Sequence, residues 1–276
     1  MRAGETIKRA SAAVDALLPP APGVTVLIYH RVGGGSDSAV DMDADAFEQQ
    51  LAHLAEHHDV ITLETALMRL AEPSSSAGGP AGDSARRSVV ITFDDGTADF
   101  TDVSVPALVR QQLPATLYAA TRFIDEGEDF PWGAPPTSWA ALRDAVSTGF
   151  DTVGSHTHSH WLLDRQPANE IEADLDRSIE LIATNLGVAP ADFAYPKALP
   201  AAAVSEIAVR RRFRSAALAS SRVNRPGATD PFRLARTPIQ RGDGFRWFAA
   251  KANGGLRLEG EIRAVVARVR YRGSSS

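Results

Sequence analysis

One stretch of the chain limits its fold more than any other. Residues 88–96 read Ser-Val-Val-Ile-Thr-Phe-Asp-Asp-Gly, an apolar, mostly β-branched run that ends in two acids and a glycine. Such a run is typical of a buried strand that opens into a tight turn. A turn needs at most one acid, and two adjacent carboxylates repel each other unless a positive group lies beside them. A metal ion is the natural candidate for that group.

The other ligands of such an ion are expected in residues 151–160, which read Asp-Thr-Val-Gly-Ser-His-Thr-His-Ser-His. His156 and His160 are four residues apart, which directs both imidazoles to the same side of one helical turn or of a tight loop leading into one. Together with the carboxylate of Asp95 they make a set of three protein ligands with an open position, as in catalytic zinc sites. Thr157 occupies the position of the glutamate in His-Glu-x-x-His metalloproteases, so the pattern disfavours a peptidase.

These motifs resemble those of the polysaccharide deacetylases, also called the NodB-homology family or carbohydrate esterase family four. The family's Thr-Phe-Asp-Asp-Gly motif and its Ser-His-Thr motif with a second histidine are both present. Residues 26–32, Val-Leu-Ile-Tyr-His-Arg-Val, and residues 193–196, Phe-Ala-Tyr-Pro, extend the likeness over most of residues 24–240. They indicate the branch with Tyr-His and Phe-Ala-Tyr-Pro motifs. The resemblance implies an α/β fold, an irregular, TIM-like (β/α) barrel of seven or eight parallel strands.

The remaining sequence agrees with that architecture. Strand patterns that alternate with helical patterns are typical of parallel βαβ units, and the candidate site residues follow strands, where the active sites of barrels lie. Asp45 followed by Glu48 predicts the start of one helix, and the clearest helix is expected over residues 168–186, with Gly187 as its C-terminal cap.

The length of 276 residues is ordinary for a single α/β barrel. We expect residues 1–22 to be an N-terminal peripheral segment and residues 23–241 to form the NodB-like domain. Residues 242–276 are expected to be a C-terminal peripheral helix and tail.

Composition limits the partners and the metal ligands. The net charge of −5 gives no basic footprint for nucleic acid, and no run is long and apolar enough for a membrane span. With no cysteine, a metal ion must be held by histidine and carboxylate. Because the N-terminus has no convincing signal peptide, we expect a cytoplasmic protein, although the extracellular face is not excluded. The oligomeric state stays open.

The second acid of the pair, Asp94, is expected to act as a base that takes a proton from metal-activated water. The alternative is a side chain that merely caps the turn, but one carboxylate on the metal and one off it explains why two acids are adjacent. Many relatives have a C-terminal Leu-x-His motif that supplies the general acid. No histidine follows His160 in this chain. The acid is therefore His30, Asp94 acting twice, or missing.

The Phe-Ala-Tyr-Pro segment implies further site residues by the same resemblance. Tyr195 and Pro196 are expected to line the substrate groove, and the backbone N–H of Lys197 to stabilise the oxyanion. Trp132, Trp139 and Trp161 flank these motifs in sequence, and Trp161 is taken as a substrate-binding candidate because aromatic faces suit sugar rings, although tryptophan is just as common in a core. In many relatives an arginine before this motif orients the catalytic aspartate, but Ala194 stands at that position. The orientation of the aspartate then requires another group.

We therefore expect a metal-dependent hydrolase that removes N-acetyl groups from an N-acetylated sugar or polysaccharide, whether polymeric, lipid-linked or nucleotide-linked. Its cofactor would be one divalent ion, with zinc favoured by ligand type and cobalt, nickel or iron also compatible. One alternative is a non-catalytic carbohydrate-binding protein on the same barrel. Others are a hydrolase of a non-sugar amide and, less favoured, an iron oxygenase with a facial triad.

Overall fold

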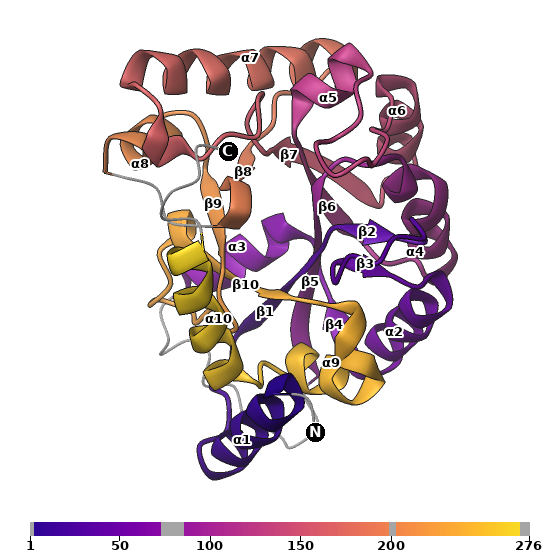
Figure 1. Ribbon diagram of the computed structural model, residues 1–276, viewed down its shortest axis with the longest axis vertical. Helices are drawn as coiled ribbons and strands as arrows, with labels where there is room; N and C mark the ends of the chain where they lie inside the picture. Colours follow the sequence, from indigo (N-terminus) through magenta and orange to yellow (C-terminus); the bar gives the residue numbers. More distant parts are fainter. Residues whose placement is uncertain (1–2, 73–85, 199–202, 271–276) are drawn as a thin grey trace.

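The computed structural model describes residues 3–72, 86–198 and 203–270 (Figure 1). Seven strands close into a barrel in the order β1-β10-β9-β8-β7-β6-β5, with β5 pairing back to β1, and β4 pairs with the outer part of β5 as an eighth strand. Every neighbouring pair in this sheet is parallel. The expected irregular (β/α) barrel is confirmed. The strands are β1 Val24–Tyr29, β4 His58–Val60, β5 Arg87–Asp95, β6 Ala115–Ala119, β7 Asp151–Ser155, β8 Asp192–Ala194, β9 Ser215–Ala219 and β10 Leu234–Pro238; a small separate pair is formed by β2 Arg31–Val32 and β3 Asp41–Met42.

Helices surround the barrel, and α1, at the bottom of the view in Figure 1, contacts the start of α10 through hydrogen bonds from Arg257 to Asp15 and from Leu258 to Ser11. The α-helices are α1 Ala3–Leu17, α2 Ala44–His57, α3 Leu63–Ala71, α4 Val105–Gln111, α5 Thr121–Glu126, α6 Trp139–Ser147, α7 Ala168–Leu186, α8 Ala203–Arg210, α9 Gly244–Ala252 and α10 Arg257–Arg270. Shorter turns are the π-helical η1 Phe100–Ser104 and the 3-10 turns η2 Leu163–Arg165, η3 Pro196–Ala198, η4 Pro231–Arg233 and η5 Arg241–Asp243.

The barrel interior becomes polar toward the carboxyl ends of its strands. Successive side chains of a strand point to opposite faces, so Phe93 packs outward against the helices while its neighbours Thr92 and Asp94 face inward. Deeper along the barrel, the interior is apolar and includes Val26, Val90 and Leu234. This change from an apolar to a polar layer places the charged groups of the barrel at one end of it.

Helix boundaries depart from the sequence patterns at two places. The helix expected to be capped by Asp45 instead begins at Ala44, with Asp43 in the extended N-cap position and no side-chain cap bond. Strand β3 holds the preceding residues extended, so the helix starts directly after it. The C-terminal segment forms two helices, α9 and α10, because residues 253–256 break the helical pattern with Asn-Gly-Gly-Leu. The proposed domain boundaries at residues 22/23 and 241/242 stay a prediction.

No helix within the described ranges combines the length and the hydropathy needed to cross a bilayer.

Asp151, the first residue of β7, is a buried carboxyl group with no hydrogen-bond partner among the described residues. Burial raises its pKa from 3.8 to about 7. Between pH 3.8 and about 7 the folded protein keeps a proton on Asp151 that the unfolded chain has lost. The free energy of unfolding therefore falls as the pH rises through this range. We expect Asp151→Asn to raise the free energy of unfolding above pH 7 by up to about 4 kcal/mol, and to change it little near pH 4.

Urea unfolding at about pH 8.5 and about pH 4 measures this difference. An equal effect of Asp151→Asn at both pH values would show that the carboxyl group is not neutral in the folded protein at low pH and charged at high pH, and would contradict the prediction.

Candidate metal centre and catalytic site

The Asp-Asp pair ends β5 in a turn that separates the two carboxylates. Asp94 continues the inward-facing row of the strand, whereas Asp95 has a left-handed backbone with φ 75°. Strand alternation alone would direct the Asp95 side chain away from the interior, and the left-handed backbone interrupts that alternation. Gly96 follows with φ 96°, and a Cβ there would lie 3.1 Å from the Ile124 side chain, so the turn favours glycine.

The two histidines of the motif lie on a tight loop after β7, not on a helix. Thr157 and His160 have left-handed backbones with φ 67° and φ 57°. The Thr157 hydroxyl accepts a hydrogen bond from the His160 N–H at 2.8 Å, and the Asp174 carboxylate accepts bonds from the N–H groups of His158 and Ser159 at 2.8 and 2.9 Å. This bracing sets the loop so that both imidazoles face Asp95.

Asp174 is a residue that the sequence analysis misses. It lies on α7 and is buried, although the helix buries an otherwise largely apolar stripe. An acid within such a stripe is the signal that could have found it, because a buried carboxylate requires hydrogen-bond donors.

Asp95, His156 and His160 converge on one point. Their ligand atoms all lie within 4.8 Å of one another, and all three side chains are buried. The Asp95 Oδ1 atom is 3.7 Å from His156 Nε2 and 3.2 Å from His160 Nε2. These separations suit atoms about 2 Å from a common ion.

The chemistry of the donors also fits a divalent cation. His156 Nδ1 lies 2.8 Å from the Ala194 carbonyl oxygen. Because only a protonated Nδ1 can donate to a carbonyl, this bond leaves the Nε2 lone pair directed at Asp95, the arrangement usual for a metal-binding histidine. Burial lowers the pKa of His156 to about 4, so the ring is neutral. The pKa of Asp95 is lowered although its burial opposes ionisation, because His160 donates to it and attracts its charge.

Asp94 is held by an arginine that the sequence analysis does not assign. Arg236 of β10 makes a bidentate pair with it, Nη1 to Oδ1 at 2.6 Å and Nη2 to Oδ2 at 2.8 Å, and is completely buried. Its guanidinium also lies 5.0 Å from the Tyr118 ring centroid. Burial favours the neutral acid, but the attraction of Arg236 outweighs it and lowers the pKa of Asp94. Many relatives have this arginine at the position of Ala194 on β8, whereas in this chain the guanidinium that orients Asp94 comes from Arg236 on β10.

A cavity of about 900 Å³ contains these groups. Asp94, the three candidate metal ligands, His30 and Lys197 all line it. His30 follows β1, and its buried Nδ1 atom has no hydrogen-bond partner among the described residues. Lys197 has a left-handed backbone with φ 55°.

The three residues expected to bind the substrate do not line this cavity. Tyr195 is buried against Phe193, and neither Tyr195, Pro196 nor Trp161 is among the residues that line the cavity. Trp132 does line it, 42% exposed, with its ring centroid 5.7 Å from that of His160. A tryptophan from the loop after α5 thus faces the cavity.

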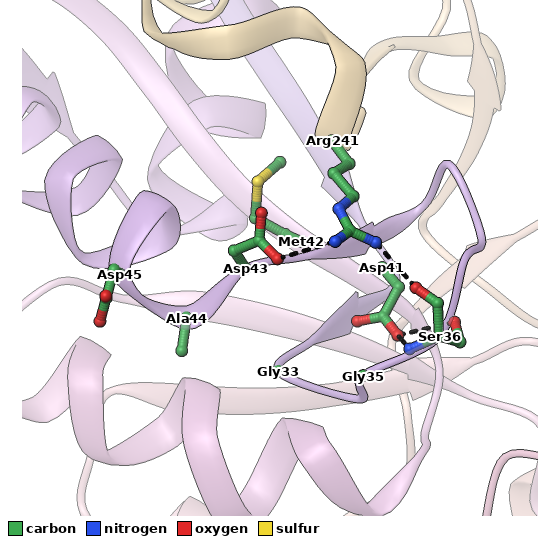
Figure 2. Close-up of a pocket in the computed structure, with 9 residues that line it drawn as sticks. All are labelled: Gly33, Gly35, Ser36, Asp41, Met42, Asp43, Ala44, Asp45 and Arg241. Atoms are coloured by element: carbon green, nitrogen blue, oxygen red, sulfur yellow. Dashed lines mark hydrogen bonds and ion pairs between the residues drawn. The ribbon is translucent and has the colours of Figure 1, made fainter.

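A second, smaller hollow of about 300 Å³ lies beside β3 (Figure 2). Figure 2 shows Arg241 reaching both the Asp43 carboxylate, at 3.3 Å, and the Ser36 carbonyl oxygen, at 2.9 Å. Asp41 accepts hydrogen bonds from the hydroxyl and the N–H of Ser36. These polar groups supply one another's hydrogen-bond partners. Their contacts hold the loop that contributes Ser38 and Val40 to the larger cavity.

Comparisons with known proteins agree with this geometry. Residues 81–215 match the family model described as polysaccharide deacetylase. A structure of IcaB from Ammonifex degensii superposes with a TM-score of 0.71 at 23% identity, covering 85% of this chain and 98% of that one. The Streptococcus pyogenes deacetylase PplD, in complex with acetate, gives 0.70 at 20% identity over 83% and 97% of the two chains.

A de-N-acetylase from Aggregatibacter actinomycetemcomitans gives a TM-score of 0.65 at 18% identity, over 83% of this chain and 99% of that one. At these identities the likeness establishes a common fold. No protein of curated function matches the chain.

Proposed function

We propose that the chain is a member of the polysaccharide deacetylase family, whose model matches residues 81–215, and that it is a metal-dependent hydrolase that removes the N-acetyl group from an N-acetylated sugar. The observation that carries the proposal is the buried Asp95, His156 and His160 group, which shares one cavity with Asp94 held by Arg236. The reaction converts an acetamide and water into acetate and an amine.

Asp95, His156 and His160 would hold one divalent ion, for which zinc suits a donor set of two imidazoles and a carboxylate. A divalent ion bound there supplies Lewis acidity toward an amide carbonyl and acidifies water. Asp94 would take the proton of the attacking water, since its carboxylate is kept ionised and aimed by Arg236. The burial of these groups strengthens their electrostatic interactions with a substrate.

His30 and Lys197 would complete the reaction. The backbone N–H of Lys197 would donate a hydrogen bond to the carbonyl oxygen as negative charge develops on it. His30 would give a proton to the departing amine, and its unpartnered buried Nδ1 on the cavity wall supports this role. Trp132 would contact the sugar beside the ligands through the exposed part of its ring, which stacks on Phe130 and has the Lys197 ammonium 5.5 Å from its centroid. Tyr195, Pro196 and Trp161 do not line this cavity, so any effect that they have on substrate binding would be transmitted through the residues that do.

Removal and return of the metal tests this proposal. We expect chelator-stripped protein to release no acetate from N-acetylglucosamine oligomers, and added zinc or cobalt to restore the release. His156→Gln is expected to weaken zinc binding by at least about 100-fold, because it removes a ligand that Ala194 orients. Bound zinc is measured by elemental analysis, and acetate in a coupled assay.

His158→Gln is the matched control, since His158 lies in the same loop but contacts the Thr121 hydroxyl at 3.0 Å. It should bind zinc and release acetate as the wild-type protein does. Sugar binding that survives metal removal, with no hydrolysis of any acetamide, would instead favour the non-catalytic alternative. Hydrolysis confined to amides without a sugar would favour the alternative that the protein is a hydrolase of a non-sugar amide.

A further inference from the structure

The cavity that contains the catalytic groups continues between two helices outside the barrel core. Ile7 of α1 and Ile262 and Val266 of α10 line it together with Leu218 and Ala235 of the barrel strands. These aliphatic side chains lie in the same part of the lining as the ion pairs of Arg222 with Glu261 and of Arg263 with Glu259. A substrate bound at the catalytic groups therefore has aliphatic side chains within the same cavity.

Helix α10 is amphipathic in an unusual sense, because its apolar stripe does not face the protein core. Leu258, Ile262, Val265 and Val266 recur at helical spacing and are 37–58% exposed, whereas Glu259, which also lines the cavity, is buried. Helices on globular proteins normally bury such a stripe. Two residues of this stripe, Ile262 and Val266, line the cavity, and exposed apolar side chains there offer a surface for an apolar ligand.

Buried charges hold α10 in this orientation. Lys251 of α9 lies 2.8 Å from Asp243 and 3.8 Å from Glu259, and Lys8 of α1 lies 2.6 Å from Asp243. These groups would be left unpaired if α10 rolled its apolar stripe inward, which is costly for buried charges.

Close backbone packing has the same effect. Gly260 packs so tightly on Ser221 that a Cβ on it would lie 2.5 Å from the serine side chain. The exposed stripe is therefore fixed by the contacts of the opposite face of α10.

The cavity lining has few features that would bind a nucleotide-linked sugar or a polysaccharide. Each of its arginines pairs with a carboxylate, as in Arg222 with Glu261 at 2.7 Å and Arg263 with Glu259 at 2.7 Å, so these cations are engaged before a nucleotide phosphate arrives. Trp132 is the only Phe, Tyr or Trp among the described lining residues. A long polysaccharide chain would be expected to meet more aromatic faces.

We propose that the substrate carries an aliphatic chain on its N-acetylated sugar, and that this chain lies between α1 and α10 against Ile7, Ile262 and Val266. The occupant belongs to the substrate because the apolar wall and the catalytic groups share one cavity. This proposal rests on the proposed deacetylase function and narrows its substrate class. The chain is either the aglycone of the N-acetylated sugar or, in place of the acetyl group, a longer acyl group on the sugar nitrogen.

Paired substrates test the proposal. The kcat/KM of the zinc-loaded protein is measured on methyl and octyl glycosides of N-acetylglucosamine, below the micelle concentration, and on the methyl glycoside of N-octanoylglucosamine. We expect the octyl glycoside or the N-octanoyl sugar to exceed the methyl N-acetyl glycoside by about tenfold or more, mainly through KM. Each fully buried methylene contributes about fourfold. Which of the two long-chain substrates gains shows which end of the sugar carries the chain.

Val266 and Val265 provide a matched pair of variants. Both are 58% exposed on α10, but only Val266 lines the cavity. Val266→Asp should bring the ratio of long-chain to methyl kcat/KM close to one, because the chain would meet a carboxylate. Val265→Asp should leave that ratio as in the wild-type protein.

The possible failures are distinguishable. If no N-acetylated or N-octanoylated sugar is hydrolysed, the proposed function itself fails. If the methyl glycoside is hydrolysed but neither long-chain substrate is preferred, the aliphatic subsite is wrong and the deacetylase stands. A gain with N-acetylglucosamine oligomers but not with octyl substrates, or equal effects of both valine variants, also overturns the subsite.

Discussion

Replacing Asp94 by asparagine is expected to lower the kcat of acetate release by about 1,000-fold while the protein keeps its metal ion. The amide cannot accept the proton of water, and general-base catalysis typically contributes about 10²–10⁴-fold. Metal content should persist because Asp95, His156 and His160 form the ligand group without Asp94. Acetate release and elemental analysis on the same preparation measure both effects.

Asp95→Asn is the informative companion, because it changes the neighbouring acid, which lies within the ligand group. It should weaken zinc binding and lose activity together, whereas Asp94→Asn separates the two. An Asp94→Asn protein that hydrolyses substrate at the wild-type rate would remove Asp94 from the mechanism. Loss of zinc from the Asp94→Asn protein would place that residue among the groups that hold the metal.

Replacing Arg236 by leucine is expected to destabilise the protein by about 3–5 kcal/mol and to abolish measurable activity. The substitution leaves the buried carboxylate of Asp94 without its bidentate partner, which is the costly way to break a buried ion pair. It also frees the Asp94 side chain to leave the orientation that the guanidinium fixes. Urea unfolding reports the first effect and acetate release the second.

Two further variants separate a positioning role from a general loss of stability. Arg236→Lys keeps the charge but not the planar fork, so it should recover much of the stability and little of the kcat. Arg233→Leu removes a surface arginine three residues earlier, whose partner Glu206 keeps a second arginine, Arg210. That change should cost less than about 1 kcal/mol.

A double-mutant cycle isolates the pair. Asp94→Asn combined with Arg236→Leu should be more stable than the sum of the single effects predicts, by about 1–3 kcal/mol, because no carboxylate is then left unpaired. Simple additivity of the two effects would contradict a direct interaction between Asp94 and Arg236.

Local sequence patterns were sufficient for the seven strands that close the barrel and for the convergence of the three candidate ligands, but not for the short strands β2, β3 and β4. The run that ends at Asp95 is apolar enough to be buried as a strand, and the His156–His160 spacing limits where the two rings can point. In a parallel barrel the carboxyl ends of strands meet at one face, so acids and histidines that follow β5 and β7 must lie close together. Their role as metal ligands stays a prediction.

Residues whose partners are remote in sequence were not predictable in this way. Arg236 lies 142 positions from Asp94, and only the closure of β10 against β1, beside β5, brings it to the carboxylate. Arginines are rarely buried unless they are paired. Because the sequence around Arg236 does not identify its partner, the burial of this side chain was not predictable. The bracing of the His156 loop by Asp174 depends in the same way on how α7 packs.

The amino-acid sequence by itself indicated the resemblance to the polysaccharide deacetylases, and this resemblance implied the barrel. Short-range patterns of polarity and spacing indicated parallel βαβ units and the meeting of one acid with two histidines. Only the tertiary structure decided which arginine holds Asp94, which tryptophan lines the cavity, and that Ile262 and Val266 of α10 line the cavity instead of packing into the core. Those outcomes depend on contacts between segments that are far apart in the chain, and the free energy of such contacts is determined by packing, which no local pattern encodes.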